Sequence, residues 1–101
     1  MNDNELVNFA RSRFDHESHK RLLKEKYESK LLFAYKGGMF RAGFELITFL
    51  KCFDHAHMVI KDLYDTPVEV NVQELLNLAN ERYMEQMNAW LVEYESTRNQ
   101  R

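Results

Sequence analysis

Hydrophobic positions recur at intervals of three and four over most of the chain, the spacing that places side chains on one face of an α-helix. Near the start, Leu6, Ala10 and Phe14 follow one another at steps of four. A second series with the same step comprises Leu23, Tyr27, Leu31 and Tyr35. Because residues 3–36 also contain no Gly or Pro, they are predicted to be helical, with Asn2 or Asp3 as the N-cap.

A polar stretch, residues 15–19, separates the two series. It favours two helices or a kink, and the alternative is one long helix whose middle faces water. Gly37-Gly38 after Lys36 is typical of a helix C-terminus. In a second interpretation, the short apolar runs 31–35 and 39–42 on either side of the glycines form a β-hairpin.

Further along, Phe44, Ile47 and Leu50 predict a short buried helix over 44–53. Residues 58–64 and 68–70 are rich in β-branched side chains, and a turn containing Asp65 and Pro67 joins them. This pattern predicts a β-hairpin at about 58–70.

The last helix is predicted at about 72–98. Asn71 is a suitable N-cap, and Glu74 three residues later completes a capping-box pattern. The apolar positions again follow at three and four, and they comprise Val72, Leu75, Leu76, Ala79, Tyr83, Met87, Trp90 and Tyr94. Some 26 residues span roughly 39 Å, more than the ~30 Å width of a small domain. The end of this helix is therefore expected to protrude or to meet a partner.

These elements make a mainly helical α+β fold. With 101 residues, 45% of them hydrophobic, and few Gly or Pro for linkers, residues 1–101 are expected to form a single domain. Neither a signal peptide nor a transmembrane segment is recognisable. One cysteine, Cys52, cannot form an internal disulfide, which agrees with a reducing compartment.

Charge is unevenly distributed although the net charge is only −2. Residues 1–41 carry nine Lys/Arg against six Asp/Glu, a balance of +3, and residues 42–101 carry five against ten, a balance of −5. The simpler interpretation is two solvated faces that attract each other within one domain. The split could also orient two copies head to tail.

Candidate metal ligands occur in two places. His16 and His19 lie one helical turn apart, while Cys52, His55 and His57 cluster near a loop. Neither group has the spacing or the four ligands of a closed zinc site, so no metal site and no cofactor are predicted. Catalytic signatures are also missing, and the chain is predicted not to be an enzyme.

Basic residues in the first third could contact nucleic acid. The candidates are Arg11, Arg13, Lys20, Arg21, Lys24 and Lys30. Glutamates interleave with them in patterns that pair on a helix surface, and a pI near 6.1 is a poor match to a dedicated nucleic-acid binder. A small nucleic-acid-associated regulator is therefore the second hypothesis.

The distal half of the last helix is the preferred interaction site. It concentrates aromatic residues and methionine, which are enriched at interface cores. The proposed contact residues are Tyr83, Met87, Trp90, Leu91 and Tyr94. In the alternative interpretation they pack on the helices at the front of the same chain, which is favoured for Tyr83 and equally compatible with the sequence for Trp90, Leu91 and Tyr94.

Two segments, KGGMFRAG at 36–43 and ERYMEQMNAW at 81–90, resemble small uncharacterised proteins of T-even-like marine tailed phages of the cyanophage myophage type. The resemblance implies a phage product located in the host cytoplasm or the virion. We therefore expect a non-enzymatic interaction or assembly module that binds itself, as a homo-oligomer, or another phage or host protein.

Overall fold

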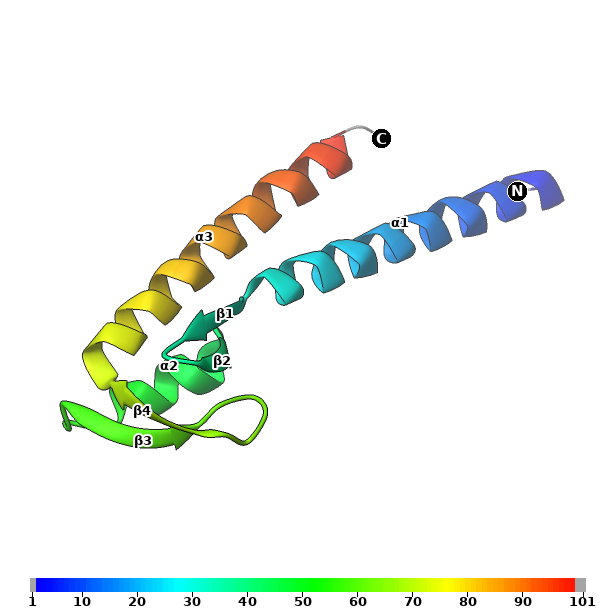
Figure 1. Ribbon diagram of the computed structural model, residues 1–101. Helices are drawn as coiled ribbons and strands as arrows, with labels where there is room; N and C mark the ends of the chain where they lie inside the picture. The colour runs from blue at the N-terminus through cyan, green and yellow to red at the C-terminus, as the bar shows by residue number, and fades with distance from the viewer. Residues whose placement is uncertain (1, 100–101) are drawn as a thin grey trace.

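The computed structural model describes residues 2–99, and within them the chain forms three helices and two β-hairpins (Figure 1). In chain order the elements are α1 (Asp3–Lys30), β1 (Leu32–Tyr35), β2 (Gly38–Arg41), α2 (Phe44–Lys51), β3 (His57–Lys61), β4 (Pro67–Asn71) and α3 (Val72–Asn99). The expected α+β class is confirmed. The molecule is long and narrow, 65 × 24 × 22 Å, because α1 and α3 run side by side away from a small head made of the other elements.

Helix α1 starts where the sequence predicts but is continuous and shorter than expected. The Asn2 side chain accepts a hydrogen bond from the Glu5 backbone N–H at 2.8 Å, and the Glu5 carboxylate accepts one from the Asn2 N–H. The favoured break at residues 15–19 is wrong, because one helix passes through them. The predicted end at Lys36 is also wrong, since the helix stops at Lys30.

A β-hairpin follows α1, as in the alternative interpretation of residues 31–42. Strands β1 and β2 pair antiparallel, with Tyr35 opposite Gly38. Lys36 and Gly37 both have positive φ, 45° and 83°, which is the two-residue turn whose twist matches that of the strands. Gly38 is needed for a different reason, because a Cβ there would lie 2.8 Å from the Val68 side chain. The glycine pair thus makes a turn and a close contact rather than a helix cap.

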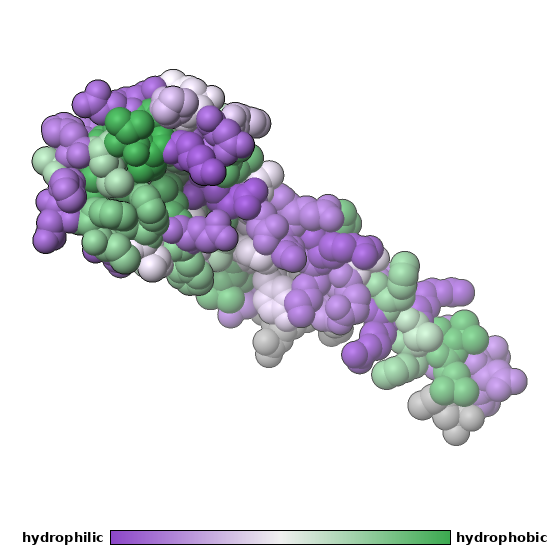
Figure 2. Space-filling view, turned by 90° about the horizontal axis from the view of Figure 1, so that it is seen from below, coloured by the Kyte–Doolittle hydropathy of each residue, from purple (hydrophilic) through white to green (hydrophobic). Residues whose placement is uncertain are grey.

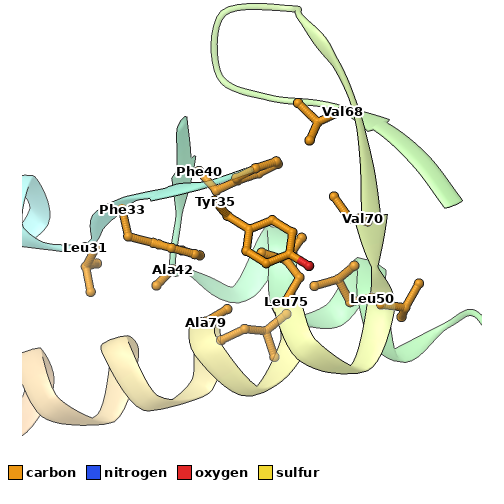
Figure 3. Close-up of a cluster of buried hydrophobic side chains, with 12 residues drawn as sticks. Leu31, Phe33, Tyr35, Phe40, Ala42, Leu50, Val68, Val70, Leu75 and Ala79 are labelled. Carbon is orange, nitrogen blue, oxygen red and sulfur yellow. The ribbon is translucent and has the colours of Figure 1, made fainter. Parts of the chain in front are cut away.

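The head has a continuous hydrophobic core between the two hairpins, α2 and the first half of α3 (Figure 3). Its fully buried side chains include Val70 from β4, Leu50 from α2 and Leu75 from α3. The predicted hairpin near 58–70 is confirmed as β3–β4, with Met58 paired to Val70. Helix α3 begins directly after β4, and the Asn71 side chain accepts a hydrogen bond from the Glu74 N–H at 3.0 Å.

The distal half of α3 packs on the second half of α1, and we call this pair of half-helices the arm. Leu23 and Tyr27 of α1 are buried, and the Trp90 ring of α3 stacks on Tyr27 with 5.9 Å between ring centroids. In contrast, residues 2–15 of α1 are all exposed, and we call this segment the tip. The overhang expected at the end of the last helix therefore lies mainly at the start of the first one.

Candidate interaction surfaces

Four of the five residues predicted to bind a partner from α3 lie on one face of that helix and are partly buried within the chain, and the fifth, Leu91, is exposed. Tyr83 and Met87 are partly buried against the head core, and the Tyr83 ring lies 5.2 Å from that of Phe44. Trp90 is partly buried by its stack on Tyr27, and Tyr94 is also partly buried. Leu91 is 54% exposed, which makes it the member of the set most accessible to a partner.

A polar network ties the arm together. Glu93 of α3 accepts hydrogen bonds from the Tyr27 hydroxyl at 2.5 Å and from the Lys26 ammonium at 2.9 Å. The bond from Tyr27 first, and that from Lys26 second, lower the pKa of Glu93. The same carboxylate raises the pKa of both Lys26 and Tyr27. This contact joins the basic front of the chain to its acidic rear, the direction of attraction that the charge split indicates.

Asp62 holds the two hairpins of the head together. Its buried carboxylate accepts backbone hydrogen bonds from Tyr64 and Thr66 in its own turn and from Met39 in the other hairpin, each at 2.9 Å. These bonds, that from Met39 foremost, lower the pKa of Asp62. The sequence pattern does not reveal this contact, because local spacing around the turn carries no information about Met39, 23 residues away.

An apolar groove of about 600 Å³ runs between α2 and β3, and we call it the head groove. Its most exposed apolar side chains are Phe44 on α2, 70% exposed, and Val59 on β3, 64% exposed. Phe49 and Leu63 line it as well. The sequence placed Phe44 in a buried helix face, whereas the structure leaves its side chain at the rim of this groove.

The tip carries a second apolar surface, made of Leu6, Val7, Ala10 and Phe14, which we call the tip stripe. All but Ala10 are large side chains that are more than half exposed. Phe14 and Leu23 are nine residues apart, two and a half helical turns, so they point to opposite sides of α1. Because Leu23 faces α3, the tip stripe is turned away from the arm contact, whereas the exposed Phe9 lies on the same side of α1 as Leu23 and Tyr27. Figure 2 shows the hydrophobic residues of one face gathered at its two ends, with a hydrophilic middle.

The six basic residues of the nucleic-acid hypothesis all lie on α1 and are exposed. At about 100° per residue, Arg13, Lys20 and Lys24 share one side of the helix, and Glu17 lies among them. Arg11 and Lys30 point elsewhere. No contact of the described residues favours this hypothesis, which stays a prediction.

Metal ligands and membrane spans were also considered for the described part of the chain. Among residues 2–99, no three His, Cys, Asp or Glu side chains converge on a common point that could hold a metal ion. His19 is instead hydrogen-bonded to Thr97, while Cys52, His55 and His57 are exposed in the head. None of the described helices is long and apolar enough to cross a bilayer.

Comparison with known proteins adds no relative from which a role could be transferred. No protein-family model, curated protein or solved structure matches the chain. The resemblance to phage proteins consequently remains a prediction, and function has to be argued from the surfaces themselves.

Proposed function

We propose that this chain is a non-enzymatic protein–protein interaction module. The observation that carries the proposal is the tip, an amphipathic helix end whose large apolar side chains are not covered by any other part of residues 2–99. A contiguous patch of exposed apolar side chains is uncommon on a soluble protein and typically marks an interaction site. An amphipathic helix that lays its apolar face in a groove is a recurring mode of protein recognition.

The distal α3 supplies a second contact area under the same proposal. Leu91, Val92 and Met84 are each more than half exposed along the outer side of the arm. Trp90 and Tyr94, the anchors expected from the sequence, contribute the parts of their rings left open after packing. A role in particle assembly is the narrower form of this proposal and rests on the phage resemblance, so neighbouring genes for head, neck or tail proteins would support it.

Site-specific photo-cross-linking tests the general proposal. A photoreactive phenylalanine analogue replaces Phe14 or Leu91, and a matched control places it at Glu69, an exposed polar position on β4. We expect discrete protein adducts from Phe14 or Leu91, identified by mass spectrometry, and none from Glu69. Smears of equal intensity at all three positions, or no protein adducts, would refute an interaction role.

The same experiment separates the nucleic-acid alternative. Phosphate contacts weaken steeply between low and moderate salt, whereas apolar helix contacts change little. Adducts to nucleic acid that disappear over this salt range would favour the regulator hypothesis.

A further inference from the structure

We propose that the partner of the tip is a second copy of this chain: the tip stripe of each copy docks in the head groove of the other, and two antiparallel molecules form a closed dimer. This inference rests on the proposed interaction function and names its partner. Its starting observation is that one chain carries both halves of a helix-in-groove contact. The helix is the uncovered tip, and the groove is the apolar channel between α2 and β3.

The positions of the two surfaces allow both contacts to form at once. The head and the tip lie at opposite ends of a molecule 65 Å long, and the hydrophobic areas at both ends are visible on the same face (Figure 2). Two copies laid face to face with their long axes antiparallel therefore bring each tip over the partner's head. The arrangement is two-fold symmetric and closes after two subunits, so it does not propagate into a filament.

The chemistry of the head groove favours an apolar helix over a small polar ligand. Ligand sites combine apolar walls with a few available polar groups that fix orientation. The buried polar group of this groove is Asp62, and its two carboxylate oxygens are already engaged by the backbone N–H groups of Met39, Tyr64 and Thr66. The exposed walls at Phe44 and Val59 instead suit side chains such as Leu6 and Phe14.

Charges flanking the two surfaces can also be matched. The tip begins with acidic Asp3 and Glu5 and continues with basic Arg11 and Arg13. The groove is bordered by basic Arg41 and Lys61 and by acidic Glu45, all exposed. Each sign on the helix therefore has an oppositely charged counterpart on the rim.

The area involved is compatible with a reversible dimer. A phenylalanine side chain buries about 150–250 Å² when covered, and each reciprocal contact covers one on the tip, Phe14, and two in the groove, Phe44 and Phe49. Counting both contacts and the smaller apolar residues, the dimer hides on the order of 1,200 Å², the lower limit for stable specific interfaces. We expect concentration-dependent association rather than a permanent dimer.

Sedimentation equilibrium of the full chain over micromolar to near-millimolar concentrations tests the dimer. We expect wild type to approach twice its monomer mass at the upper end. Phe14→Asp in the tip and Val59→Asp in the groove should each weaken association at least about tenfold, because each change is present at both contacts. Both positions are exposed, so circular dichroism should show an intact fold.

Mixing the two variants is the decisive step. A heterodimer of Phe14→Asp with Val59→Asp retains one intact tip and one intact groove that face each other, so the mixture should associate although neither variant does so alone. If the two tips paired with each other instead, the groove would not take part, and Val59→Asp would dimerise without the second variant. A matched change on the arm, Leu22→Asp, should leave the dimer intact, because Leu22 is 61% exposed and belongs to neither surface.

A wild type that is monomeric at every concentration, or a dimer that only Leu22→Asp disrupts, would overturn the inference. Neither result removes the proposed function, because cross-links from Phe14 or Leu91 to a different protein would still support an interaction module. If the protein neither associates nor forms discrete protein cross-links, both the reciprocal dimer and the proposed interaction function are refuted.

Discussion

The head and the arm of this molecule are built on different physical principles. In the head, two hairpins and α2 cover the first half of α3, and Val70, Leu75 and Ala79 are completely removed from water. In the arm, two helices touch along one seam, which combines the Tyr27–Trp90 stack with a network of charged and polar side chains. The comparison indicates that stability is concentrated in the head, while the arm holds surfaces at a distance from it.

The largest expected effect comes from the head core. Leu75→Ala should lower the free energy of unfolding by about 3–4 kcal/mol, because it opens a cavity at a site with no access to water. Urea unfolding followed by circular dichroism measures the change. The matched control on the arm, Leu91→Ala, should stay within about 0.5 kcal/mol of wild type. Equal losses in the two variants would contradict the division into a packed head and a weakly packed arm.

A smaller loss is expected where the two hairpins of the head touch. Gly38→Ala should cost about 2 kcal/mol, because its new methyl group would overlap the Val68 side chain, 2.8 Å away. Gly43 provides the control, since a methyl group there meets nothing closer than 4.0 Å. Gly43→Ala should cost less than about 1 kcal/mol in the same urea assay.

Breaking the arm should have a moderate and local effect. Trp90→Ala removes the stack on Tyr27, and we expect a loss of about 1.5 kcal/mol. Hydrogen exchange should speed up in the second half of α1 and the distal half of α3, with amides of β4 unchanged. Faster exchange of the β4 amides to the same extent would show that head and arm open as one unit.

The smallest expected effect is a difference in pH dependence. The pKa values of Asp62 in the head and Glu93 in the arm are both lowered, so each stabilises the fold above its unfolded pKa, and this contribution is lost as pH falls through the folded value. Lys26 and Tyr27 have raised pKa values, so their contribution is present below pH 10 and is lost as pH rises through the folded values. Acid should therefore loosen both regions, and alkali mainly the arm.

Trp90 is the single tryptophan, so its fluorescence reports on the arm. We expect an alkaline change in this signal that Glu93→Gln moves to lower pH, because the hydrogen bond to Glu93 is the main cause of the raised pKa values of Tyr27 and Lys26. Asp62→Asn should instead reduce the acid sensitivity of the head, detected by circular dichroism, and leave the alkaline change in place. An alkaline fluorescence transition at the same pH in wild type and Glu93→Gln would contradict this assignment.

The contrast between head and arm also explains which elements could be predicted. The β3–β4 hairpin and the start of α3 follow from local signals, namely the β-branched runs with their turn and the Asn71 cap. The β1–β2 hairpin is the less favoured interpretation of the sequence. Its apolar runs are too short to distinguish a strand from a helix, and a glycine pair after Lys36 is typical of a helix end. What decides between them is the close contact of Gly38 with Val68, thirty positions later, which no local pattern contains.

In α1 the polar stretch 15–19 between the two apolar series predicts a break in the helix. The structure shows one helix with two differently directed faces, of which only the second is covered within the chain. The aromatic anchors of α3 were identified as functional by residue type, yet the sequence did not reveal that Tyr27 would cover Trp90. The head groove escaped prediction altogether, since its walls come from α2 and β3, which are separate along the chain.

The elongated outline has a practical consequence for any study of this protein in solution. Its radius of gyration is 19.4 Å, against about 13 Å for a compact chain of 100 residues. A monomer of 12.2 kDa will therefore diffuse slowly and leave a sizing column early, at the position of a larger globular protein. Elution volume alone would therefore make even a monomer look like a dimer. The absolute mass from sedimentation or light scattering is the quantity that distinguishes the two states.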